Sequence, residues 1–155
     1  MKLNEITSNH VVPVLYASAD NMNGTMNTDI VKCAGSGIVF EMTKAVGATG
    51  TSTITVDACD DVTPSNTTAV AFYYRASTTP DTWGDWTAAT AAGFVTTAGS
   101  NQMYQVYVDN QTLGALGYEY ARLTGVEVVS SAVIMTINAH ILNTHYAPQP
   151  STVLT

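Results

Sequence analysis

Apolar and polar residues alternate with a period of two along most of the chain, which is the pattern of half-buried β-strands. The segment 132–142, AVIMTINAHIL, is the clearest example. There Val133, Met135 and Ile137 share one face, while Thr136 and Asn138 share the other. Such alternation is typical of antiparallel sheets with one face on the core and one face in water.

The same pattern recurs in seven further segments, which we expect to be strands. They are 10–18, 29–34, 37–46, 51–58, 69–77, 101–110 and 116–123. The first contains Pro13, which cannot donate to a sheet ladder, so it is expected at a sheet edge. Turn residues (Gly, Pro and Asn) lie between the segments, and spacing of this kind predicts an all-β fold, an antiparallel sandwich of jelly-roll type.

The chain has 155 residues, which predicts one domain. We expect the sandwich over 10–146, an extended N-terminal arm over 1–9 and a C-terminal tail over 147–155 with two prolines. The segment 85–94, DWTAATAAGF, is predicted as a loop with room for a turn of helix. Inward positions of the strands predict a core that includes Ile54, Val56, Phe72, Val106, Val133, Met135 and Ile137.

Charged residues are few and mostly acidic, which limits the classes of molecule that the chain is expected to bind. The net charge is −7, and only five residues are Lys or Arg. Nucleic acids and anionic membranes bind proteins through clustered Lys and Arg side chains, so we expect neither to be a partner of this chain. The N-terminal segment lacks the apolar stretch of a signal peptide, which predicts synthesis in a reducing cytoplasm. Cys33 and Cys59 match no metal-ligand spacing and are expected to be small buried side chains.

Three carboxylates, Asp57, Asp60 and Asp61, lie within five positions and are the strongest candidate for site chemistry. Oxygen ligands of this type bind hard cations, and paired carboxylates perform acid–base catalysis. The strand pattern ends among them, and Pro64 follows, so we interpret the group as the polar rim of a sheet. A surface cation is the alternative. We expect no catalytic residue, no metal and no cofactor.

His140 and His145 are five positions apart and would point to opposite faces of a strand, so we expect an exposed structural histidine. Trp83 and Trp86 occupy a loop with Asp81 and Asp85 nearby. Either the two tryptophans fold down onto the core, or they form a contact surface, because Trp is enriched in binding hot spots.

The order of motifs over residues 38–146 resembles head decoration (cement) proteins of tailed bacteriophages. The resemblance is carried by DACDDV, by the DTWG loop, by YEYARL and by a closing apolar strand that ends at Tyr146. It implies a virion protein, made in the bacterial cytoplasm, that binds the outer surface of the major capsid protein lattice as a homotrimer. Candidate interface residues are Trp83 and Trp86 with Leu3 and Ile6 of the arm.

Two other functions are compatible with the residues. Within the virion class, a tail-tube, tail or head–tail joining protein is the alternative. Outside it, the tryptophan loop would suit a carbohydrate- or host-binding β-sandwich module. An enzyme is disfavoured, because no nucleophile, acid–base pair or phosphate loop can be assembled from the motifs present.

Overall fold

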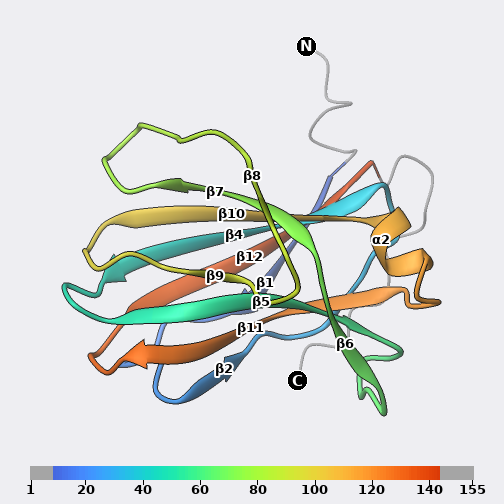
Figure 1. Cartoon of the computed structure of the whole chain (residues 1–155), viewed down its shortest axis with the longest axis horizontal. Coiled ribbons are helices and arrows are strands. Elements are labelled where there is room, and N and C mark those ends of the chain that lie inside the picture. Colours follow the sequence, from blue (N-terminus) through green and yellow to red (C-terminus); the bar gives the residue numbers. More distant parts are fainter. Residues whose placement is uncertain (1–8, 144–155) are drawn as a thin grey trace.

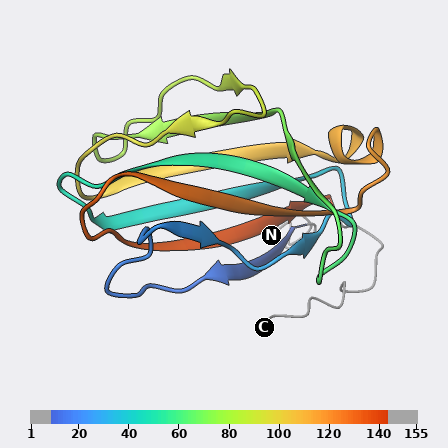
Figure 2. The same cartoon turned by 60° about the horizontal axis from the view of Figure 1, so that its bottom comes forward.

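The computed structural model describes residues 9–143, which form two antiparallel sheets stacked face to face (Figures 1 and 2). Residues 1–8 of the predicted arm, with Leu3 and Ile6, and the whole predicted tail lie outside the described residues. So does the end of the predicted sandwich, residues 144–146, with His145. Within the described range the prediction of an all-β sandwich is confirmed.

The first sheet, sheet A, has six strands. In spatial order they are β1 (His10–Leu15), β12 (Ile134–Leu142), β4 (Gly37–Val46), β10 (Gln102–Asp109), β7 (Phe72–Ser77) and β8 (Thr87–Ala89). Strand β1 lies at the edge, as Pro13 predicts, and its register with β12 shifts between Pro13 and Leu15.

The second sheet, sheet B, is built around the long pair β11 and β5. Its strands are β2 (Thr25–Asn27), β11 (Tyr120–Val129), β5 (Thr51–Cys59) and β6 (Thr67–Val70), with β3 (Val31–Lys32) paired to β11 and β9 (Phe94–Val95) paired to β5. The short strands flank the two long ones, so the edges of sheet B are made of segments of two to four residues.

The core lies between the inner faces of the two sheets, where the alternation of each strand places its apolar residues. All seven predicted core residues are buried, with at most 3% of their surface exposed. Phe94 of sheet B joins the two layers, because its ring stacks on Tyr74 at 4.0 Å and also contacts Phe72 and Tyr104 of sheet A. The period-two pattern therefore predicts the inner face correctly.

The predicted strand 69–77 is instead two strands in different sheets. It breaks at Ala71, where the chain crosses from β6 of sheet B to β7 of sheet A. Val70 and Phe72 are both buried on either side of the break. The alternation continues through the crossing, so the sequence pattern contains no signal of the change of sheet.

The secondary structure of two further short segments differs from the prediction. The segment 85–94 contains no helix but the short strand β8 and the start of β9. A helix, α2 (Asn110–Gly114), forms where the sequence predicts a turn, and Asp109 caps it by accepting a 2.6 Å bond from the Thr112 amide. These elements span two to five residues, too few for a periodic signal.

Strand β11 also differs from its prediction. It starts at Tyr120, four residues after the predicted start, and continues through Val129 into a segment predicted as a turn. The extension pairs with β5 and tolerates a register shift between Glu127 and Val129. A bulge of this kind lets a strand continue where its residues do not alternate.

Lys44 is buried on the inner face of β4, a place where a lysine is not expected. It follows Phe40 and Met42 at the next inward position, and only 1% of its surface is exposed. Its ammonium donates 2.9 Å hydrogen bonds to the carbonyl oxygens of Gly50 and Thr97. Lys44 thus links the β4–β5 turn to the segment before β10, and desolvation lowers its pKa.

We expect Lys44 to give stability a distinctive pH dependence. Its pKa is lower in the folded chain than its ordinary value of 10.5. Between the two values the unfolded chain binds more protons, so the free energy of unfolding rises with pH, by about 1.4 kcal/mol per unit of pKa shift. Urea titrations from about pH 8 to 10.5 should show wild type gaining stability relative to Lys44→Met.

The comparison with Lys44→Met isolates this effect. Cys33 and Cys59, whose pKa values burial raises to about 11, bias stability in the opposite direction, but they are present in both proteins. A stability difference that stays flat or falls with pH would contradict the assignment.

Candidate functional site

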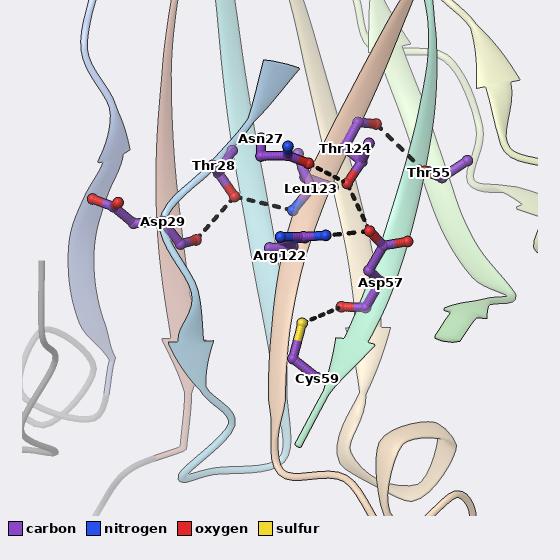
Figure 3. Close-up of polar contacts among 9 residues, drawn as sticks. All are labelled: Asn27, Thr28, Asp29, Thr55, Asp57, Cys59, Arg122, Leu123 and Thr124. Atoms are coloured by element: carbon purple, nitrogen blue, oxygen red, sulfur yellow. Dashed lines mark hydrogen bonds and ion pairs between the residues drawn. The ribbon is translucent and has the colours of Figure 1, made fainter. Parts of the chain in front are cut away.

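The three clustered carboxylates do not converge on one point. Asp57 lies on the outer face of β5, where its Oδ2 is 3.3 Å from Arg122 Nε and 2.7 Å from Thr124 Oγ1 (Figure 3). Thr124 Oγ1 also lies 2.9 Å from the side-chain oxygen of Asn27 on β2. The group connects three strands of sheet B across its outer face, which is a structural role.

Asp60 and Asp61 belong to the turn that follows β5. The Asp60 carboxylate accepts bonds from the Ser65 amide at 3.1 Å and from the Asn66 amide and side chain at 3.2 Å. Desolvation acts to raise the pKa of Asp60, but the bonds from Asn66 and Ser65 outweigh it and lower the pKa. Among residues 9–143 no three His, Cys, Asp or Glu side chains are placed to hold a metal ion.

The two cysteines are buried free thiols, as predicted. Burial is the main cause of the raised pKa of each, about 11. Both thiols are therefore protonated at neutral pH, and thiolate chemistry is suppressed.

The most distinctive arrangement lies on the outer face of sheet A, around Arg75 of β7. The guanidinium carbon of Arg75 is 4.7 Å from the ring centroid of Trp83 and 4.8 Å from that of Trp86. Arg75 Nε and Nη2 donate to Gln105 Oε1 at 2.8 and 2.6 Å, and Gln105 Nε2 donates to Glu41 Oε2 at 3.1 Å. We name these five residues the Arg75 clamp.

Strand register brings the clamp together. Gln105 of β10 lies directly between Arg75 of β7 and Glu41 of β4 in the cross-strand ladder. Trp83 and Trp86 come from the β7–β8 connection, which is tied back to β7 by the bond from the Gly84 amide to the Ala76 carbonyl. The sequence reveals the tryptophans but not the polar row of the clamp, because Glu41, Arg75 and Gln105 lie on three strands that are far apart along the chain.

Of the two interpretations of the tryptophan pair, the core plug is wrong. Trp83 is half-buried and Trp86 is 44% exposed, and neither belongs to the core between the sheets. Both rings lie against Arg75 on the outer surface, and Trp86 also makes an edge contact with Tyr107 at 6.4 Å. An exposed indole with a fixed orientation is a candidate contact residue.

A shallow cavity of about 310 Å³ lies beside the clamp. It is lined by Asn9, Val39, Glu41, Arg75, Trp86, Gln105, His140 and Leu142. His140 is half-buried rather than exposed as expected, and its Nε2 is buried with no hydrogen-bond partner in the described part of the chain. The cavity thus joins an exposed aromatic ring to polar groups of both signs.

The outer face of sheet B has a different chemistry at the end away from Asp57. A cross-strand row there runs from Thr25 through Val126 and Thr53 to Val95. Val126 and Val95 are 49% and 54% exposed, and the nearby Val128 is 55% exposed. This valine row is an uncharged surface of exposed β-branched side chains.

Comparisons of the chain with protein-family models, curated proteins and solved structures found no match. Within residues 9–143 no helix has the length and apolar character needed to cross a membrane. The functional argument therefore rests on the two outer faces.

The Asp57 and Arg122 side chains should be energetically coupled, although the 3.3 Å distance between Asp57 Oδ2 and Arg122 Nε is not short for an ion pair. The two side chains are only 15% and 23% exposed, so water screens the pair less than a surface pair. A double-mutant cycle with Asp57→Ala and Arg122→Ala, measured by urea unfolding, should give about 1 kcal/mol of coupling.

The exposed pair Lys32–Glu119 is the matched control. It is shorter, at 2.8 Å, but its side chains are 41% and 65% exposed. Its coupling should be clearly smaller than that of the Asp57–Arg122 pair, because water screens exposed charges. Equal couplings for the two pairs would show that burial is not the deciding factor.

Proposed function

We propose that this chain is a structural protein of a bacteriophage virion, a head decoration protein that binds the outer surface of the major capsid lattice and stabilises the head. The motif order over residues 38–146 supports the proposal, as does the confirmed β-sandwich fold. Its place is the head surface rather than the genome-facing interior, because a net charge of −7 would be repelled by packed phosphate.

The observation that carries the proposal is the valine row on sheet B. Val126 and Val95 are β-branched apolar residues with about half of their surface in water. Their neighbours in the row are threonines, so the row carries no charge that would have to be desolvated. Such a surface is suited to docking on a large protein array, where many weak contacts add up.

Particle stability tests this docking surface. Heads that carry wild-type protein should resist heat or urea better than heads assembled without it. Val126→Asp places a charge in the centre of the row, and we expect at least about a tenfold loss in affinity for the heads, measured by co-sedimentation.

Leu116→Asp provides the control, because Leu116 has the same 49% exposure but lies outside the valine row. It should bind the heads like wild type. Wild-type binding by Val126→Asp would exclude the valine row as the docking surface. Labelled protein found only on tails in electron micrographs would favour the tail or head–tail alternative over a head protein.

We further propose a homotrimer. Edge strand β1, HVVPVL, contains no Asp, Glu, Lys or Arg to deter pairing, and Val11 on it is 51% exposed. A neighbouring copy would cover such an edge, and cyclic association is natural on a symmetric lattice. Light scattering on the purified chain should give three times the 16.4 kDa chain mass, and a strict monomer at tens of micromolar (about 50 μM) would refute the trimer.

A further inference from the structure

We propose that the Arg75 clamp and its adjoining cavity bind the ring of a neutral saccharide. This site lies on sheet A, on the opposite side of the sandwich from the valine row, so it is independent of lattice docking. The proposal rests on the shape of the cavity, on the polar groups that line it, on its balance of charge and on the exposed face of Trp86.

The size and openness of the cavity suit one sugar ring rather than a peptide or an extended chain. Its volume of about 310 Å³ is at the lower end of the range for small-molecule sites. It opens on a sheet surface, and its lining comes from β4, β7, β10 and β12, from the β7–β8 connection and from Asn9, which precedes β1. Regular strands hold most of the lining residues, so little ordering is needed on binding.

The polar groups of the clamp keep unused hydrogen-bonding capacity. Arg75 uses Nε and Nη2 on Gln105, and Glu41 uses Oε2 on the same residue. In the described part of the chain, no hydrogen bond involves Arg75 Nη1, Glu41 Oε1 or His140 Nε2. The Arg75 and Glu41 side chains thus keep a free donor group and a free acceptor, and a sugar hydroxyl can both donate and accept. His140 Nε2 is buried, so it becomes a partner only if the imidazole turns toward the cavity.

The charge balance gives an ionic ligand no net attraction. Arg75 and Glu41 carry opposite charges and are joined through Gln105, so the site has no net charge from this pair. A carboxylate or phosphate would be attracted by Arg75 but repelled by Glu41, and an ammonium would meet the reverse. An uncharged polyhydroxyl ligand can hydrogen-bond to both groups without either repulsion.

Trp86 supplies the apolar half of the site. Its ring is 44% exposed and is held by Arg75 at 4.8 Å and by the Tyr107 edge at 6.4 Å. A pyranose presents a flat face of C–H groups, which can pack on an exposed indole while its hydroxyls reach the polar row. The contact is preorganised, because the indole is already oriented in the free protein.

Tryptophan fluorescence reports on this site alone, because Trp83 and Trp86 are the only tryptophans in the chain. The native protein is titrated with glucose, galactose, mannose, N-acetylglucosamine and their neutral disaccharides. At least one of these should shift the emission saturably, with Kd in the millimolar range, about 0.1–10 mM. Galacturonate should bind no more tightly than galactose, because the attraction of its carboxylate to Arg75 is offset by repulsion from Glu41.

Saturation-transfer NMR on the same sugars provides a readout that does not need the fluorophore. Trp86→Ala should lose the saccharide signal, and Glu41→Gln should weaken binding by about tenfold. Tyr16→Ala is the control, since Tyr16 is 67% exposed and lies outside the cavity lining. Circular dichroism of each variant checks that the fold is kept.

Three results would overturn the proposal. One is the absence of any saturable response to the neutral sugars. Another is wild-type saccharide binding by Trp86→Ala. The third is loss of head binding by Trp86→Ala with no response to sugars, which would make this face a protein dock. Val126→Asp should leave saccharide binding intact, so failure of the lattice proposal and failure of this one are distinguishable.

Discussion

The contact between the two inner sheet faces is the interaction on which the rest of the structure depends. Phe94 concentrates this contact, since one ring from sheet B meets Phe72, Tyr74 and Tyr104 of sheet A. Within sheet B, Gly125 of β11 leaves room for the core side chain of the neighbouring strand β2, because a Cβ atom there would come within 2.9 Å of Met26 Cε. Because interiors are close-packed, a shift of either sheet would disturb many such contacts at once.

Once the inner faces are set, the period of two determines what each outer face presents. On sheet A the outward positions of β4, β7 and β10 hold Glu41, Arg75 and Gln105 in one row. On sheet B the outward positions of β11, β5 and β9 hold the valine row. The two candidate surfaces are thus consequences of one packing arrangement, and a one-residue slip in register would destroy both.

The two outer faces differ in chemistry, and each face suits a different one of the two proposed binding functions. An uncharged surface such as the valine row favours broad contact with another protein, because no charged group has to lose water. The Arg75 clamp instead offers an oriented aromatic ring and hydrogen-bonding groups of both signs, which favours a small polar ligand. Since the faces point in opposite directions, a chain docked through sheet B would present the clamp to the surroundings.

The sequence by itself determined the long strands, their inward residues and the edge position of β1, because these follow from local alternation and from the missing amide hydrogen of Pro13. It also identified the two tryptophans, although not what they contact. Short elements such as α2 and β8 escaped prediction, since a few residues cannot establish a period.

Only the tertiary structure decided the change of sheet at Ala71, the burial of Lys44 and the assembly of the Arg75 clamp. In each case the deciding partner is distant in sequence: Lys44 donates to Thr97, and Arg75 reaches Glu41 only through Gln105. Alternation specifies which face a residue occupies. Which strands become neighbours, and in which register, depends on packing of the whole chain, and that pairing created the candidate site.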